Sequence, residues 1–122
     1  MMSQSQSHQY TCPCCGYPGL KSKPYAEMPH PLSASLRQEA LPPYEDLWGM
    51  GSYEVCSCCG YEFGHDDNPG MGRPISFVEH LQEWVEADGQ SWFAPEDKPK
   101  GWSLEAQLSQ AGYPLPSAKE DN

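Results

Sequence analysis

The sequence predicts a small α+β protein in which two cysteine-containing turns, flanked by short antiparallel strands, are followed by C-terminal helices. Three observations predict this fold. All six cysteines fall in two copies of the pattern C-x-C-C-G-Y. Apolar and polar residues alternate beside the second copy, as in a strand, and a helical apolar pattern with cap residues follows. A chain of 122 residues has the usual size of one domain.

The two cysteine motifs are the most informative feature of the chain. Each contains a C-x₂-C pair, Cys12/Cys15 and Cys56/Cys59, which is the ligand spacing of tetrahedral zinc sites. A glycine follows each pair, and glycine permits the tight turn that aims backbone N–H groups at sulfur. We therefore predict one Zn²⁺ held by these four cysteines, so that the α+β fold is a zinc ribbon.

Six cysteines can also form a disulfide scaffold or a redox site, and both alternatives are open at this point. Residues 1–9 are polar and lack the apolar stretch of a signal peptide, so we expect a cytoplasmic protein with reduced thiols. Neither C-x₂-C pair opens a βαβ pattern, as a thioredoxin-like motif would. Cys14 and Cys58 are surplus to a four-cysteine site. They are interpreted either as small side chains beside the metal or as ligands, by exchange or to a second metal.

Composition divides the chain into a lead, a domain and a tail. Pro and Gly supply 13 and 11 residues, so the chain can bury only a small core, which a metal would help to stabilise. We expect a disordered lead at 1–9, a single zinc-ribbon domain at 10–112 with a proline-rich insertion at 21–50, and a loose tail at 113–122.

Short strands are expected beside both cysteine turns. Residues 10–20 would contain the first turn with its flanking strands. Residues 52–55 and 61–63 lie on either side of the second turn, and the latter segment alternates between apolar and polar side chains.

Three helices are expected. The segment 33–41 has serines at its start and is followed by a proline, which are helix start and stop signals. In 76–88, Ser76 and Glu79 form a capping box, in which each side chain accepts a hydrogen bond from the other residue's backbone N–H. Apolar residues recur in that segment at helical spacing. The third helix is expected at 103–111.

Charge argues against a nucleic-acid partner, and the lack of a long apolar run argues against a membrane partner. The net charge is −10 and the pI is about 4.6, whereas nucleic-acid binding needs Lys and Arg to replace the counterions of phosphate. Residues 39–122 carry 16 acidic against four basic side chains. No apolar run approaches the length of a membrane span. We therefore expect no nucleic-acid or membrane partner, and an attraction to basic proteins.

Catalysis is not predicted. No P-loop, nucleophile elbow or dinucleotide-binding fingerprint is present. The best candidate constellation is Glu62, His65, Asp66 and Asp67, where a histidine beside carboxylates could bind a divalent metal or transfer protons. The same run is also typical of a solvated turn. We predict that the protein is not an enzyme.

Motifs outside the cysteines resemble those of a known family. The matching stretches, over about residues 10–110, are Tyr10-x-Cys12-Pro13-x-Cys15-Gly16-Tyr17-x-x-Leu20, Pro42-Pro43-Tyr44, Ser52-Tyr53-Glu54-Val55-Cys56-x-x-Cys59-Gly60-Tyr61-Glu62-Phe63-Gly64-x-Asp66-Asp67, Ser76-Phe77, Trp84, Gly89, Trp92-Phe93, Lys98-Pro99, Trp102-x-Leu104 and Gln107-Leu108. They resemble the small bacterial cysteine-rich CPCC family, although the segment 21–47 is longer than expected for it. The resemblance implies a zinc ribbon with a C-terminal helical extension. Such genes are found among bacterial competition and toxin–immunity loci, which implies an inhibitory partner protein.

We therefore predict a non-enzymatic, zinc-stabilised protein-binding module, most concretely an immunity or antitoxin-like inhibitor of a basic toxin. The alternative is an intracellular zinc-ribbon accessory or regulatory factor that docks on a larger machine. The partner surface would combine carboxylates with loop tryptophans, because Trp is frequent in interface hot spots; the tryptophans are alternatively core side chains. The residues predicted to contribute are Asp66, Asp67, Glu83, Glu86, Trp92 and Trp102.

Overall fold

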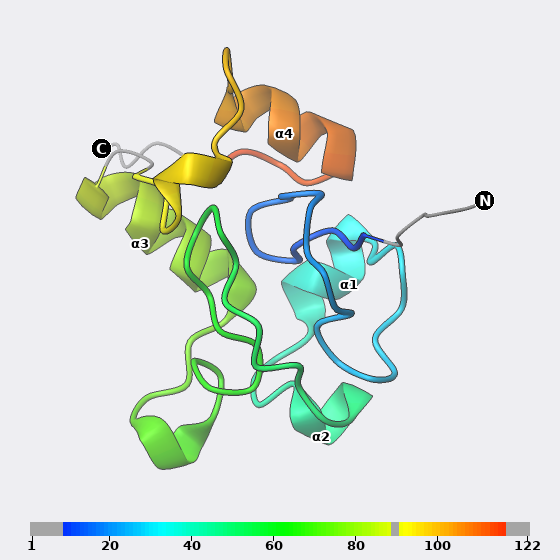
Figure 1. Cartoon of the computed structure of the whole chain (residues 1–122). Helices are drawn as coiled ribbons and strands as arrows, with labels where there is room; N and C mark the ends of the chain where they lie inside the picture. Colours follow the sequence, from blue (N-terminus) through cyan, green and yellow to red (C-terminus); the bar gives the residue numbers. More distant parts are fainter. Residues whose placement is uncertain (1–8, 89–90, 117–122) are drawn as a thin grey trace, which may run out of the picture.

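Helices and turns, rather than strands, form the secondary structure of this protein (Figure 1). The structure is a computed structural model that describes residues 9–88 and 91–116. The helices are α1 (Ala34–Glu39), α2 (Glu45–Trp48), η2 (Pro69–Met71), α3 (Phe77–Asp88), η3 (Pro95–Asp97) and α4 (Leu104–Ala111), of which η2 and η3 are 3₁₀ turns. None of the described helices is both long and apolar enough to span a bilayer.

The predicted zinc ribbon with antiparallel strands is wrong, because the described residues contain no sheet. Their strand pairing is limited to three isolated bridges, Tyr10–Leu20, Tyr25–Gly51 and Val55–Glu62. Beside the second turn the pairing ends where the backbone leaves the extended region, at Tyr53 with φ 62° and Gly64 with φ 107°. Each cysteine turn brings its flanks together, as predicted, but neither pair of flanks continues as a ladder.

The helix predicted at 103–111 is confirmed almost to the residue, and the helix predicted at 33–41 is confirmed but is shorter. In α4, Ser103 accepts a hydrogen bond from the N–H of Ala106, and Gly112 ends the helix in the left-handed conformation (φ 81°). Glycine adopts this conformation without the steric cost that other residues incur. In α1, Ser33 accepts from the N–H of Leu36, but the helix stops at Glu39 rather than at residue 41.

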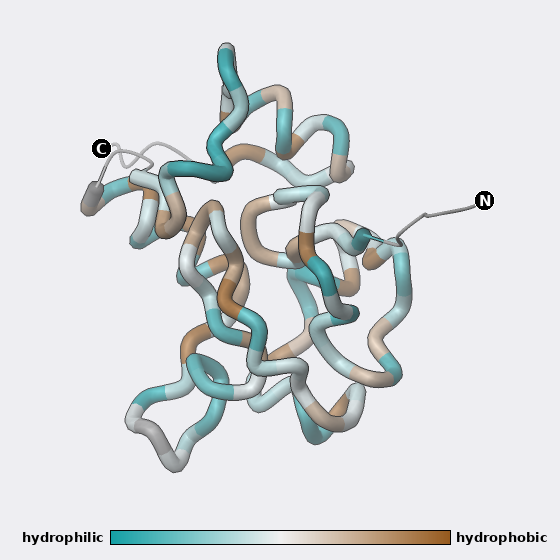
Figure 2. The backbone as a smooth tube through the Cα atoms, in the orientation of Figure 1, coloured by the Kyte–Doolittle hydropathy of each residue, from teal (hydrophilic) through white to brown (hydrophobic). Residues whose placement is uncertain are grey.

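Aromatic side chains, together with the six buried cysteines, fill the core. The largest fully buried side chains are Tyr25, Tyr44, Tyr61, Phe63 and Phe77. In Figure 2, hydrophobic stretches of the chain lie where the two cysteine turns meet α3, and the loops that project outward are mostly hydrophilic. A core of this composition gains from ring packing as well as from burial of apolar area.

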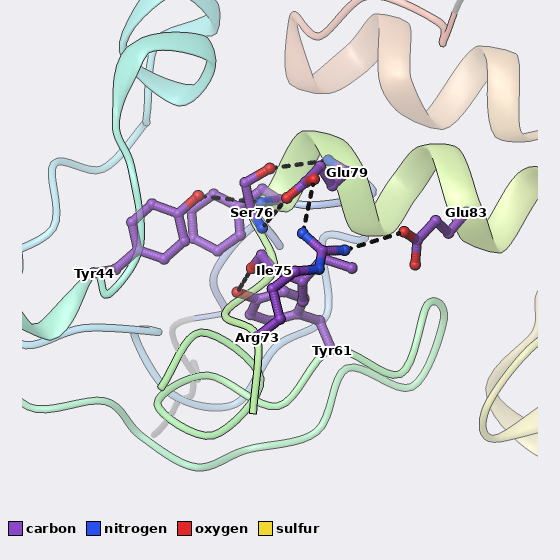
Figure 3. Close-up of polar contacts among 8 residues, drawn as sticks. Tyr44, Tyr61, Arg73, Ile75, Ser76, Glu79 and Glu83 are labelled. Carbon is purple, nitrogen blue, oxygen red and sulfur yellow. Dashed lines mark hydrogen bonds and ion pairs between the residues drawn. The ribbon is translucent and has the colours of Figure 1, made fainter. Parts of the chain in front are cut away.

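The start of α3 is held by several residues (Figure 3). The capping box is formed as predicted: Glu79 N–H donates to the Ser76 hydroxyl, and Ser76 N–H donates to the Glu79 carboxylate, both at 3.1 Å. The backbone N–H of Phe77 donates to the Tyr44 hydroxyl at 3.1 Å, and the Tyr61 hydroxyl donates to the Ile75 carbonyl, just before the helix, at 2.7 Å. This helix is therefore fixed both to the second cysteine turn and to the loop before α2.

The two cysteine turns lie side by side between α1 and α3, and α4 crosses one end of them (Figure 1). The segment 21–50, predicted as an insertion, supplies α1 and α2. Of the predicted lead and tail, residues 1–8 and 117–122 lie outside the described residues. Within the predicted tail, Tyr113 is buried, and its hydroxyl donates to the Leu32 carbonyl at 3.2 Å.

Candidate metal centre

The two cysteine turns, which we call knuckle 1 (residues 12–17) and knuckle 2 (residues 56–61), have the same backbone geometry. In each, the N–H of the first cysteine donates to the tyrosine carbonyl, at 2.8 Å in knuckle 1 and 3.0 Å in knuckle 2. The glycine N–H donates to the carbonyl of the first cysteine at 2.9 Å in both. Gly16 and Gly60 have φ angles of 84° and 81°, which glycine adopts at no steric cost.

Side by side, the knuckles bring four thiols together in the interior. The ligand atoms of Cys12, Cys15, Cys56 and Cys59 all lie within 4.8 Å of one another, and all four residues are buried. The Cys12–Cys59 sulfur distance is 3.9 Å and the Cys15–Cys56 distance is 3.7 Å. A Zn–S bond of about 2.3 Å gives a tetrahedron with S–S edges of about 3.8 Å. Four buried cysteines therefore stand at a spacing that can hold a metal ion.

The four thiols differ in their tendency to ionise. Burial opposes the thiolate of Cys12, but hydrogen bonds from the neighbouring thiols hold its pKa well below the ordinary value. Burial raises the pKa of Cys15 and Cys59 well above the ordinary value, and it also raises the pKa of Cys56. A metal cation that binds here would replace the protons of the three thiols whose pKa is raised.

The surplus thiols have hydrogen-bond partners outside the four-cysteine group. The Cys14 thiol donates to the Phe77 carbonyl at 3.3 Å, and the Cys58 sulfur accepts from the Gln107 amide at 3.5 Å. Cys14, Cys59 and His80 also lie close enough to form a second candidate metal group. However, the His80 Nε2 atom is engaged with the Cys59 carbonyl at 2.9 Å. The four-cysteine group is thus the better set of ligands.

A buried arginine supports knuckle 1. Arg37, on α1, is only 2% exposed, and its guanidinium donates to the carbonyls of Pro13 at 2.6 Å and Cys14 at 2.8 Å. It also lies 4.5 Å from the centre of the Tyr113 ring. Among the described residues it forms no ion pair with a carboxylate. Sequence reasoning missed Arg37, because an arginine in a short helix carries no local sign of burial.

Helix α4 covers the other side of knuckle 1. The Gln107 amide donates to the Cys15 carbonyl at 3.0 Å, and its oxygen accepts from the Trp102 indole N–H at 2.9 Å. Sequence reasoning missed Gln107 too, although a signal was available. It lies three residues after Leu104 and four before Ala111, on the apolar stripe of the predicted helix.

The residues predicted to bind a partner are not gathered on one surface. Asp67 is buried and accepts hydrogen bonds from the N–H groups of Tyr44 at 2.8 Å and Gly64 at 2.9 Å. Trp92 is also buried, packed edge-on against the Tyr17 ring at 5.5 Å. Both therefore lie inside the fold.

The remaining four keep some exposure. Glu83 and Glu86 are exposed on α3, where Glu83 lies 3.7 Å from Arg73 (Figure 3) and Glu86 accepts from Gln82 at 2.6 Å. Trp102 is half-buried, and its indole N–H donates to the Gln107 side chain. Asp66 is also half-buried.

The candidate constellation around His65 is a local turn. Asp66 accepts from the backbone N–H of Glu62 at 2.9 Å, and the His65 ring lies 3.4 Å from the Asp66 carboxylate and 3.7 Å from the Glu62 carboxylate. The buried Asp67 carboxylate accepts from the N–H of Gly64 within the same turn and from the N–H of Tyr44 outside it. The structure thus gives these side chains a role in shaping the turn.

No protein family model, curated protein or solved structure matches this chain. The resemblance to the CPCC family therefore stays a prediction.

Proposed function

We propose that this protein is a protein-binding module whose fold is stabilised by one Zn²⁺ bound to Cys12, Cys15, Cys56 and Cys59. The observation that carries the zinc assignment is the sulfur geometry. The two short S–S distances, 3.9 Å and 3.7 Å, agree with the edges of a Zn–S₄ tetrahedron. Four sulfur ligands in tetrahedral array select zinc, or iron in an iron–sulfur site, over hard cations.

The buried Arg37 supports an anionic centre. Burial of an unpaired charge is strongly unfavourable, and this guanidinium has only carbonyls and the Tyr113 ring as neighbours in the described contacts. A Zn²⁺ ion with four thiolates has a formal charge of −2. Such a charge beside knuckle 1 would compensate the guanidinium, which has no carboxylate partner among the described residues.

The proposed role of the metal is structural. When bound, Zn²⁺ would supply four strong bonds that join the two knuckles. Four protein thiolates complete the tetrahedral shell and leave no position for a substrate or an activated water, which catalytic zinc sites require. The four cysteines are also buried, so a reacting molecule has no access to them.

Metal content measured on variants tests the zinc assignment. Protein purified under reducing conditions without added chelator should contain one Zn²⁺ per chain by elemental analysis. Cys12→Ser should lose the metal and the dispersed NMR spectrum, whereas the matched variant Cys14→Ser should keep both. Metal-free protein that retains its fold would contradict the proposal. Equal metal loss in both variants would assign Cys14 as a ligand.

Protein binding is the functional part of the proposal. Its support is the absence of a recognised catalytic motif, the net charge of −10 and the family resemblance, which points to an immunity-like inhibitor of a basic toxin. Electrostatic attraction to such a partner would make association fast and sensitive to salt. Co-expression with a basic toxin encoded by a neighbouring gene should restore growth and yield a stable complex. A non-toxic neighbour that forms no complex would instead favour an accessory factor.

A further inference from the structure

An apolar groove lies between α1 and α2, away from the metal centre. It has a volume of about 420 Å³ and is lined by Leu36, Glu39, Ala40, Leu41, Leu47 and Trp48. Leu41 is 71% exposed and Leu47 is 52% exposed. Apolar side chains that gather around a concave surface commonly mark an interaction site, whereas single exposed leucines do not.

The floor of this groove is packed into the aromatic core. Trp48 is almost wholly buried, and its ring is stacked on Tyr44 with the centroids 5.4 Å apart and the planes 7° from parallel. Tyr44 stacks in turn on Phe77 at 4.0 Å. The Phe77 carbonyl accepts from the Cys14 thiol in knuckle 1. A groove with a preordered floor loses little conformational entropy when a ligand binds.

The surroundings of the groove are acidic. Glu39 lines it, and Asp46 precedes Leu47 on α2; both carboxylates are exposed and form no ion pair among the described residues. No Lys or Arg occurs between Arg37 and Arg73, while seven acidic residues do. The Arg37 side chain points inward to knuckle 1 and does not neutralise this face.

We infer that this groove binds a basic amphipathic helix of a partner protein, with an apolar side chain seated on Trp48 and Lys or Arg facing Glu39 and Asp46. Charge complementarity and the apolar floor favour this occupant. A second copy of the chain would bring like charges together, and an anionic membrane would be repelled. The inference rests on the proposed protein-binding role and names the surface and the class of partner.

The probe is a synthetic Lys/Leu peptide of about four helical turns with its leucines on one face. The control peptide has the same composition in an order that spreads the leucines around the helix. Titration of the zinc-loaded, full-length protein should show saturable binding of the first peptide only, weaker at high salt. NMR shift changes should be concentrated in residues 34–48.

Two pairs of matched variants locate the binding site. Leu47→Ser should weaken binding about tenfold or more, whereas Leu115→Ser, which changes a leucine of similar exposure (50%) outside the groove, should not. Asp46→Lys should weaken binding several-fold, whereas Glu96→Lys, which makes the same charge change at another exposed site, should have a much smaller effect.

Metal content is measured for every variant, so that loss of the fold is distinguished from loss of the groove. Four results obtained on zinc-loaded protein would overturn the inference: no binding, equal binding of the control peptide, equal effects of the matched variants, or a dimer that Leu47→Ser dissociates. The last result would assign the groove to a second copy of the chain. None of them would alter the zinc assignment, which depends on metal content alone.

Discussion

Knuckles 1 and 2 share a sequence pattern and a backbone turn, yet the rest of the protein supports them differently. In knuckle 1, the buried carbonyls of the turn are held by side chains: Arg37 donates to two of them and Gln107 to a third. In knuckle 2, backbone groups take this part: the N–H groups of Phe93 and Ala94 donate to the carbonyls of Cys58 and Ser57. Among the described contacts, only the Cys59 carbonyl is held by a side chain, that of His80.

This difference indicates which substitutions should destabilise each knuckle. A side-chain hydrogen bond can be removed by one substitution, whereas a backbone N–H is lost only to proline. Knuckle 1 should therefore be sensitive to changes at distant positions, and knuckle 2 should depend mainly on its own residues and on the path of the chain through 93–94.

The largest expected effect is the same for both knuckles. Removal of the metal, or either of Cys15→Ser and Cys59→Ser, should unfold most of the domain, because metal binding contributes on the order of 10–16 kcal/mol in zinc peptides at neutral pH. Near-UV circular dichroism with and without a chelator measures the effect. If one of the two variants kept its metal and fold, the two knuckles would not contribute equally to the centre.

The second largest effect should be specific to knuckle 1, because it removes the Arg37 side chain. Arg37→Met retains most of the apolar stem but leaves two buried carbonyls without a donor, which should destabilise the zinc-loaded protein by about 3 kcal/mol. The control is Arg73→Met, at an exposed arginine with surface ion pairs, which should cost less than about 1 kcal/mol. Urea unfolding measures both. Similar costs would mean that Arg37 does not support knuckle 1.

Alanine substitutions of Gly16 and Gly60 compare how tightly each knuckle is packed. Alanine at either position is strained by the positive φ, at about 1–2 kcal/mol. At Gly16 a Cβ atom would also stand 3.2 Å from the Gln107 carbonyl and 3.1 Å from Ala111 Cβ, on the packed face of α4, whereas at Gly60 it would meet Phe93 at 3.5 Å, an ordinary contact. Gly16→Ala should therefore be the more destabilising by about 1 kcal/mol or more. The midpoint of thermal unfolding compares them, and a larger loss for Gly60→Ala would contradict this order.

The smallest effect concerns the cover over knuckle 1. Gln107→Leu should cost about 1–2 kcal/mol, because the Cys15 carbonyl and the Trp102 indole lose their partner. It should also speed the transfer of zinc to a coloured chelator. Gln110→Leu, at an exposed position of the same helix, is the control. If the two variants released zinc at the same rate, α4 would not protect the centre.

Features set by neighbouring residues could be predicted from the sequence. The capping box at Ser76 and Glu79 is one example, since both partners lie within one helical turn. The proximity of the two cysteines within each C-x₂-C pair is another, because each pair closes its own turn. The prediction of strands was wrong for a related reason. Alternation in 61–63 is a local signal, but a ladder requires both flanks to stay extended, and Tyr53 does not.

Features set by distant partners could not be predicted. Asp67 looked like a surface residue because its neighbours in sequence are polar or turn-forming, and for Trp92 a surface and a core position were both open; both are buried by segments far along the chain. Helix α2 was missed because four residues between a proline pair and a glycine are too few to show a period. The buried Arg37 depends on knuckle 1, which lies more than twenty residues away.

The contact between Gln107 and the Cys15 carbonyl spans 92 residues of sequence, which has a consequence for biosynthesis. A ribosome extends the chain from its N-terminus at about 5–20 residues per second, so all six cysteines emerge several seconds before α4 is complete. During that interval the thiols meet the metal ions and oxidants of their surroundings without the helix that later covers them. If the four cysteines bind a metal as proposed, the ion in the finished protein should therefore depend in part on which metals are available during translation.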